Sequence, residues 1–497
     1  MNHRQNALVR ALALTVSLSA VTAQAGTLPA TGPSDFTLDP SFGTGGSTTL
    51  EFENGVRQWD EPLAAFQDAD GGYWIAGFNR SADGGDDALA IAKLVAEGSP
   101  DAAVGDGGRL LLAPTGTEVR AVTKAGTRFY AAEAVLGRGA DVVVDCFEIS
   151  GAVCDGFGDG GHVQVAFDLG GSDDDVAAAI VVDDGAIYVA GNMSTPSAAG
   201  GASNPGIGLI KLDAATGSLD AAFGNLDGLP GRALYQLDRV VDGGDYVATN
   251  GLVVADAPAG GRRLLVTGNT PTSNVGDAEG FVIAFDAASG ALADDFGDGG
   301  VRYLTLPPGD TFGEVLPTAI ALRHDGAVLV AGDYWHDIDG AVDPEVMLAE
   351  LGPDGTLAAD FGDGGLFHYL PGYRVETLGV AERPGSGDVV ATFMTAGLFP
   401  DDYTDYQQAL IQVDRRAHAV RALTAITFPS NGIDTAARSR PAPQGVFVDE
   451  RNRTVLIGWR NWQYQPRQGL FNRDMTVARF TAEDSLFANG FGGAYAD

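Results

Sequence analysis

This chain of 497 residues carries 66 acidic side chains against 30 basic ones, which gives a formal net charge of −36 at pH 7. So acidic a surface repels nucleic-acid phosphates and anionic membranes, which excludes a nucleic-acid partner but is compatible with cations, basic partners and neutral sugars. Hydrophobic residues make up 45% of the sequence, and this share excludes a mainly disordered chain.

The chain begins with features typical of a bacterial Sec-type signal peptide. Residues 1–10 carry Arg4 and Arg10 and no acid, residues 11–23 are apolar, and Ala23-Gln24-Ala25 has small residues where a signal peptidase requires them. The apolar run is too short to span a membrane as a helix. We therefore predict a signal peptide over residues 1–25, a secreted or periplasmic protein, and no membrane insertion of the remainder.

A short phrase, an Asp followed by Phe-Gly-x-Gly-Gly, recurs along the rest of the chain. Its copies, some of them degenerate, are anchored at Phe42, Val104, Phe157, Phe223, Phe296, Phe361 and Phe491. Successive copies lie 53 to 73 residues apart, except for a last gap of 130 residues that is twice 65 and implies one decayed copy. Such a period is typical of repeat architectures.

Each interval contains the same short strand-like runs. Apolar runs at residues 176–182, 187–190 and 208–212 are separated by turns or loops, and a fourth run follows the Phe-Gly phrase, as in residues 162–167. We predict an all-β fold, a single closed β-propeller of about seven four-stranded blades over residues 26–497. A solenoid of stacked strands is the alternative.

The two ends of the chain complement each other. Residues 47–52 form a strand-like run directly after the first Phe-Gly phrase, whereas the chain stops at Phe491-Gly492-Gly493, where such a strand would follow. We expect residues 47–52 to complete the blade begun by residues 442–485, which closes the ring and leaves no free sheet edge.

These phrases resemble the delta-60 repeat of bacterial exported proteins, in which "L-D-x-x-F-G-x-x-G" follows "D-G-x-[VI]-x-V-A-G". Residues 39–46, 183–191, 325–332 and 360–365 match well, and the resemblance covers nearly all of the chain from residue 36 onward. Residues 370–440 match poorly. The resemblance implies a propeller fold and an exported location, and it supplies no catalytic residues.

The two cysteines, Cys146 and Cys154, flank a run that turns at Ser150-Gly151. Export would place them in an oxidising compartment, and the facing positions of a hairpin lie close enough for a disulfide. We predict a local structural staple rather than a redox pair, which would favour a tighter C-x-x-C spacing.

Carboxylates in the Phe-Gly phrases are a first candidate site, because Ca²⁺ prefers several oxygens on a flexible loop. The candidate ligands are Asp155, Asp159, Asp295, Asp298, Asp360 and Asp363. The simpler interpretation is that Asp and Gly form the tight turns there, and the EF-hand spacing is absent. Ca²⁺ is the only cofactor that the sequence suggests.

The segment after the second strand of each unit is a second candidate site. If these segments are loops, they project from one face, and aromatic rings beside Asn and Asp suit a sugar or a peptide. The candidates are Phe78, Asn192, Asn269, Asp333, Tyr334, Trp335, Trp459 and Trp462. Ordinary aromatic packing is the competing interpretation.

Catalysis finds little support in the sequence. The six histidines are scattered, and neither H-E-x-x-H nor G-x-S-x-G occurs. We predict an exported, non-enzymatic binding or scaffold propeller for a carbohydrate or a protein partner. The alternatives are a glycoside hydrolase or polysaccharide lyase acting through paired carboxylates, and a Ca²⁺-stabilised structural protein. The sequence does not indicate an oligomeric state.

Overall fold

The computed structural model describes most of residues 36–481. The described ranges are 36–52, 58–81, 86–113, 118–135, 139–196, 204–237, 247–271, 278–305, 313–338, 341–370, 373–396, 406–426, 442–465 and 470–481. They belong to one compact unit, Asp35–Asp497. The predicted signal peptide and the phrase at Phe491 lie outside the described residues.

Regular structure in these ranges consists of β-strands, and they contain no helix long and apolar enough to cross a membrane. The strands are β1 (Ser47–Leu50), β2 (Gln58–Gln67), β3 (Tyr73–Ser81), β4 (Ala88–Leu94), β5 (Arg109–Leu112), β6 (Glu118–Ala125), β7 (Arg128–Ala134), β8 (Val142–Glu148), β9 (His162–Val165), β10 (Asp175–Asp183), β11 (Ala186–Thr195), β12 (Asn204–Asp213), β13 (Arg232–Tyr235), β14 (Ala248–Asp256), β15 (Arg262–Pro271), β16 (Ala278–Asp286), β17 (Val301–Leu304), β18 (Gly313–Leu322), β19 (Val328–Ile338), β20 (Ala341–Leu351), β21 (Leu366–Tyr369), β22 (Tyr373–Arg383), β23 (Asp388–Ala396), β24 (Tyr406–Asp414), β25 (Ala419–Ile426), β26 (Ala442–Val448), β27 (Thr454–Gln465) and β28 (Leu470–Arg479).

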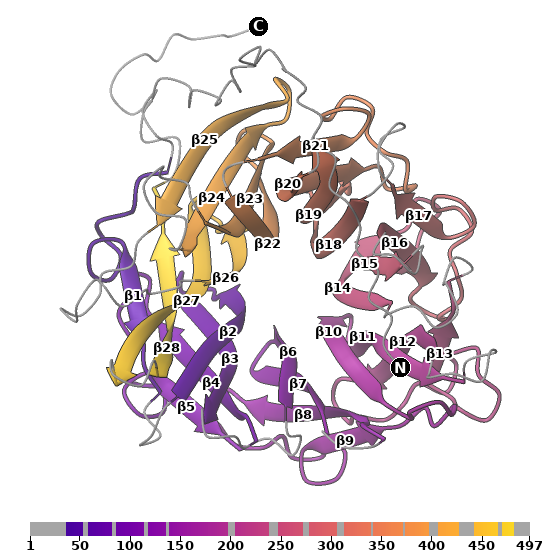
Figure 1. Cartoon of the computed structure of the whole chain (residues 1–497). Coiled ribbons are helices and arrows are strands. Elements are labelled where there is room, and N and C mark those ends of the chain that lie inside the picture. The colour runs from indigo at the N-terminus through magenta and orange to yellow at the C-terminus, as the bar shows by residue number, and fades with distance from the viewer. Residues whose placement is uncertain are drawn as a thin grey trace, which may run out of the picture. The chain divides into compact units, whose positions relative to one another are not determined.

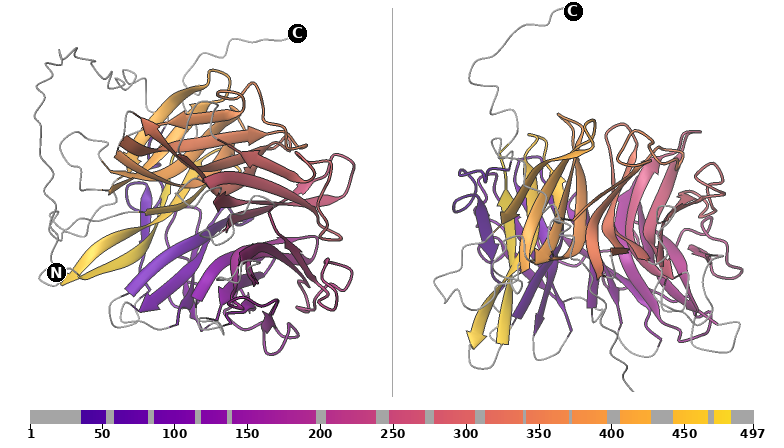
Figure 2. Two further views of the ribbon diagram at one scale, coloured as in Figure 1. Left: turned by 45° about the vertical axis from the view of Figure 1, so that its right-hand side comes forward. Right: turned by 45° about the horizontal axis from the view of Figure 1, so that its top comes forward.

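The strands pair in antiparallel groups of four, which we call quartets. Quartets 1 to 6 are β2–β5, β6–β9, β10–β13, β14–β17, β18–β21 and β22–β25, and quartet 7 joins β26, β27 and β28 to β1. The first strand of each quartet lies nearest to the centre in Figure 1, and Figure 2 shows the same sheets from two further directions. This is the arrangement of a β-propeller, and it confirms the predicted all-β fold built from four-stranded antiparallel sheets.

The second strand of a quartet has both faces buried, because quartets pack on either side of it. Along β3, Tyr73 and Ile75 belong to a hydrophobic cluster shared with quartet 7, whereas Trp74 and Ala76 belong to a cluster shared with quartet 2. Successive side chains of a strand point to opposite faces of the sheet. A continuous apolar run is therefore what a strand covered on both faces requires.

The glycine of the recurring V-A-G sequence is explained by a β-bulge in the first strand of each quartet. In quartet 3 the pairing of β10 with β11 shifts between Ala177 and Ala179, with Gly191 opposite Ala177. A Cβ atom on Gly191 would lie 2.1 Å from the carbonyl oxygen of Val176. In this quartet the bulge leaves no room for a side chain, and Gly77, Gly268 and Gly332 are equally confined, whereas quartets 2 and 6 have Glu133 and Phe393 opposite the bulge.

The Phe-Gly phrase joins several quartets to the next one. The buried ring of Phe157 in quartet 2 packs against Gly217 of quartet 3, where an added Cβ would lie 3.2 Å from the ring. The backbone N–H of Gly158 donates to the carbonyl oxygen of Thr216 at 2.9 Å. Gly217 has a φ of +71°, which favours glycine. The repeated phenylalanine is therefore a core residue of this junction.

The same junction recurs between other quartets. It pairs Phe42 with Gly98, Phe223 with Gly290 and Phe296 with Gly355. In quartet 6 the corresponding left-handed position is taken by His418, with a φ of +53°, and its ring contacts the backbone carbonyl of Asp360. Quartet 6 thus has the left-handed backbone of the junction without the glycine.

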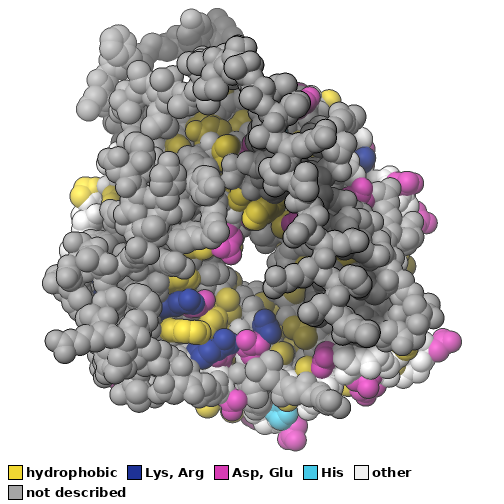
Figure 3. All heavy atoms as spheres, in the orientation of Figure 1, with side chains coloured by type: hydrophobic (Ala, Val, Ile, Leu, Met, Phe, Trp, Pro, Cys, Tyr) yellow, Lys and Arg dark blue, Asp and Glu magenta, His cyan; other side chains and the backbone are white. Residues whose placement is uncertain are grey.

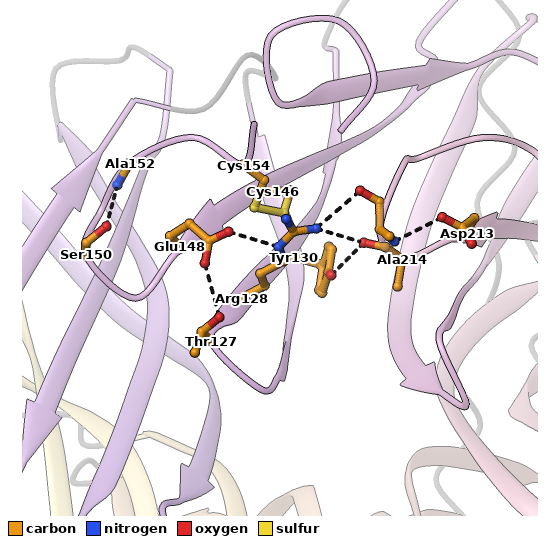
Figure 4. Close-up of a disulfide and its surroundings, with 11 residues drawn as sticks. Thr127, Arg128, Tyr130, Cys146, Glu148, Ser150, Ala152, Cys154, Asp213 and Ala214 are labelled. Carbon is orange, nitrogen blue, oxygen red and sulfur yellow. Dashed lines mark hydrogen bonds and ion pairs between the residues drawn. A yellow bond between two sulfur atoms is a disulfide. The ribbon is translucent and has the colours of Figure 1, made fainter. Parts of the chain in front are cut away.

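The predicted disulfide between Cys146 and Cys154 is present, with the two Cα atoms 5.4 Å apart (Figure 4). It lies across the hairpin that turns at Ser150 and Gly151, where the N–H of Gly151 donates to the carbonyl of Glu148. Beside it, the guanidinium of Arg128 contacts Glu148 and backbone carbonyls of quartet 3. The disulfide thus closes a local hairpin of quartet 2, and both cysteines are buried in the hydrophobic cluster shared with quartet 3.

The N-terminal segment joins three quartets. Its strand β1 pairs with β28, with Ser47 opposite Ala478 and Leu50 opposite Met475. Phe42 and Leu50 belong to the cluster between quartets 7 and 1, and Phe36 belongs to the cluster between quartets 6 and 7. Because quartet 6 lacks a Phe-Gly phrase of its own, Phe36 supplies the missing aromatic ring at that junction.

We predict that Phe42→Ala lowers the free energy of unfolding by about 3–5 kcal/mol, because it empties a fully buried aromatic site at the junction of the two chain ends. Urea denaturation followed by tryptophan fluorescence measures this loss. Leu111→Ala is the matched control, since that side chain is 42% exposed and should change stability by less than about 0.5 kcal/mol. Equal stability of the two variants would refute the role of Phe42.

Candidate functional site

The segments that we predicted as loops after each second strand are strands in the structure. The eight candidate ligand residues lie within β3, β11, β15, β19 and β27. Asn192, for example, pairs with Val176 on one side and Ile207 on the other. The loop prediction is wrong because the ladder continues beyond the bulge, which sequence pattern alone does not indicate.

Most of the predicted aromatic platform is buried. Phe78, Tyr334 and Trp459 are 8%, 5% and 7% exposed, which leaves no ring face for a ligand. Trp335 is half-buried, and its indole N–H has no partner among the described residues. The side chain of Trp462 lies outside the described residues. The expected exposure is therefore wrong for three of the rings, because neighbouring sheets cover the strand ends.

Several side chains close to the bulges accept a hydrogen bond from the next quartet and so connect the two sheets. The backbone N–H just before the bulge points away from its own sheet and requires an acceptor. Three such groups, in Val119, Thr249 and Thr377, donate to side chains of the preceding quartet, and the acceptors are Asp87 at 3.0 Å, Asn192 at 3.0 Å and Asp333 at 2.7 Å. Asn192 and Asp333 thus accept hydrogen bonds that connect successive quartets.

Proline replaces this hydrogen bond in three other quartets. The residue before the bulge is Pro62 in β2, Pro317 in β18 and Pro443 in β26. Proline has no N–H, and a strand at the edge of its sheet tolerates it. The preceding quartets therefore need no acceptor, and two of them carry Trp459 and Asn269 at the position of Asn192. This position therefore carries an acceptor in quartets 3 and 5, and a residue without that role in quartets 4 and 7.

Three buried carboxyl groups have a raised pKa. Burial raises the pKa of Asp60 and Asp333 to about 7 and that of Asp175 to about 6, although hydrogen bonds to the carboxylates oppose the shift. Asp333 accepts the N–H that precedes the bulge of β22, and Asp60 and Asp175 accept those of Phe52 and Phe167, just beyond β1 and β9. These carboxyl groups are at most 7% exposed, so their geometry serves the backbone rather than a substrate.

The structure separates the six predicted Ca²⁺ ligands into two kinds. Asp295 is paired with Arg263 at 2.9 Å, and Asp360 is paired with Arg415 at 3.2 Å. The turn residues form the other kind; they are Asp155, Asp159, Asp298 and Asp363. No cluster of three metal-ligating side chains occurs within the described ranges. Calcium binding by these loops stays a prediction.

An accessible group of side chains lies beside the centre, over β2 and β6. In Figure 3 both charge types and hydrophobic side chains gather there, next to the opening. Six side chains of β2, β3, β6 and β28 are connected by strand pairing, ion pairs and a cation–π contact, and we call them the central patch: Trp59, Glu61, Arg80, Glu118, Arg120 and Arg473. The guanidinium of Arg473 lies 4.7 Å from the ring of Trp59 and 4.3 Å from that of Trp459.

The arginines of the central patch are held by carboxylates. Arg473 pairs with Glu61, and Arg80 bridges Glu118 at 2.9 Å and the buried Asp87 at 2.5 Å. Arg120 pairs with the other oxygen of Glu118. Sequence analysis missed this group because its members come from four strands and four separate stretches of chain. The only available signal was the placement of Trp and Arg at the ends of predicted strands.

No protein-family model matches the chain, and no curated protein matches it. Among solved structures, the β-propeller domain of the Trilobed protease from Pyrococcus furiosus aligns with a TM-score of 0.39 at 8% identity, over 89% of this chain and 100% of that one. The N11 neuraminidase-like protein of influenza A/flat-faced bat/Peru/033/2010 aligns with a TM-score of 0.38 at 11% identity, over 88% and 93%. The fold assignment rests on strand pairing.

We predict that Asp333→Asn stabilises the protein more at pH 8 than at pH 5. A carboxyl with a pKa near 7 in the folded state and 3.8 when unfolded contributes stability below pH 4, and this contribution is lost as the pH rises to 7. Asparagine still accepts the N–H of Thr377 and has no charge to desolvate. Thermal melting at both pH values measures the effect.

Asn192→Asp is the matched reverse variant, because Asn192 accepts a backbone N–H at the equivalent position. It should destabilise the protein at pH 8 and have a smaller effect at pH 5. Identical pH profiles for the wild type and both variants would contradict the assignment of Asp333 as a neutral acceptor.

Proposed function

We propose that the quartets are the blades of a closed seven-bladed propeller. Seven hydrophobic clusters support this architecture, since each joins two successive quartets and one joins quartet 7 to quartet 1. The pairing of β1 with β28 supports closure by the N-terminal segment. The relation to the delta-60 repeat and export through residues 1–25 belong to the same proposal, and the disulfide is compatible with an oxidising compartment.

We further propose that the protein is an exported binding or scaffold module that engages a carbohydrate or a protein partner at the central patch. The observation that carries this proposal is the group of half-buried tryptophan and arginine side chains beside the centre, in a protein with few cations. Tryptophan and arginine are the residues that contribute most to binding energy at interfaces. Their mutual pairing keeps them ordered before a partner arrives, which lowers the entropic cost of binding.

A hydrolase or lyase finds no comparable support. Such an enzyme requires two accessible carboxyl groups with separated pKa values near a substrate cleft. The carboxyl groups with pKa values raised to 6 or 7 are buried and bonded to backbone N–H groups. Catalysis is therefore the weaker proposal.

The proposed function predicts that Arg120→Ala weakens binding of the partner at least about tenfold, the effect of losing one hot-spot side chain. The full chain is screened against glycan and peptide arrays, and the hits are measured by calorimetry. Arg262→Ala is the matched control, because the side chains of Arg120 and Arg262 are 40% and 39% exposed and Arg262 lies in a different quartet. The absence of any ligand, or equal losses in both variants, would refute the central patch as the binding site.

A further inference from the structure

The tryptophan at the edge of the central patch is fixed in position by its neighbours. Trp59 pairs with Arg473 of β28 on one side and with Arg80 of β3 on the other. The same guanidinium also contacts the ring of the buried Trp459, so Arg473 links the two tryptophans. An aromatic ring held by such contacts presents its remaining surface at little further cost in conformational entropy.

The charges around Trp59 cancel, although the protein as a whole is strongly acidic. Arg80, Arg120 and Arg473 carry three positive charges, and their partners Glu61, Glu118 and Asp87 carry three negative ones. Together with the buried Asp87, which is not itself a member of the central patch, these paired charges cancel, whereas the chain as a whole has a net charge of −36. A ligand without net charge is therefore not repelled, whereas an acidic glycan is repelled by the negative field of the whole molecule.

The central patch retains capacity for hydrogen bonds. A guanidinium has five N–H donors and a carboxylate about four acceptor sites, so a pair such as Arg473 and Glu61 keeps both donors and acceptors. The indole N–H of Trp459, a residue that is 93% buried, has no partner among the described residues. Neighbouring hydroxyl groups of a ligand can each donate and accept a hydrogen bond, so they suit both members of such an ion pair.

We propose that the central patch binds a neutral oligosaccharide, with one sugar ring stacked on Trp59 and its hydroxyl groups bonded to Arg473 and Glu61. This inference rests on the proposed function and specifies its ligand class. The apolar face of a pyranose suits the indole, and its hydroxyl groups suit the paired charges at the ring edge. A protein or peptide partner is the competing outcome of the test.

The test is calorimetric titration of the full chain with neutral hexasaccharides of glucose, mannose, galactose and N-acetylglucosamine. A uronate hexasaccharide and hexalysine are the charged probes. We expect at least one neutral probe to bind with an affinity that changes little between low and high salt, because no net charge is neutralised. Trp59→Ala should weaken this binding about tenfold or more, and Trp59→Phe should retain most of it.

Trp335→Ala is the matched control, since Trp335 is half-buried like Trp59 but lies in β19 of quartet 5. Its neutral-sugar affinity should equal that of the wild type, and melting curves verify that every variant is folded. Binding of hexalysine or the uronate alone, lost on Arg120→Ala, would overturn the neutral-sugar inference and leave the proposed function standing. If peptide and glycan arrays and all these probes fail to bind, both are overturned.

Discussion

Each four-stranded sheet of this protein is apolar on both faces and has no means of covering either face by itself. The burial of Tyr73 toward one neighbour and Trp74 toward the other illustrates the constraint that every second strand obeys. Burial of apolar surface contributes roughly 25 cal/mol per Å², so an uncovered quartet would lose most of its stabilisation. Recurrent features of the sequence hold successive sheets in contact.

Two recurrent phrases provide these contacts in different ways. The glycine of V-A-G accommodates a bulge that turns one backbone N–H of the first strand away from its own sheet. The Phe-Gly phrase places a ring against a glycine of the next quartet and adds a backbone hydrogen bond beside it. Where a phrase has decayed, other residues take its place, as His418 and Phe36 do around quartet 6.

The need to satisfy backbone N–H groups of the neighbouring quartet explains why polar residues of the second strands resembled a ligand site. Asp333 and Asn192 are acceptors for the neighbouring quartet, and Trp459 occupies the equivalent position where the neighbour carries Pro62. A buried N–H requires a partner, and a proline removes the requirement, so the residue types vary while the packing stays the same.

The sequence by itself determined the local elements, because strand runs, turns and the repeated phrases depend on near neighbours in the chain. It predicted the four-stranded unit and the pairing of Cys146 with Cys154. Only the tertiary structure decided which strand ends are covered and which charges meet. Trp59 and Arg473 are more than 400 residues apart, and β28 brings them together through a single bridge to β2. Burial depends on such distant partners, which no local pattern encodes.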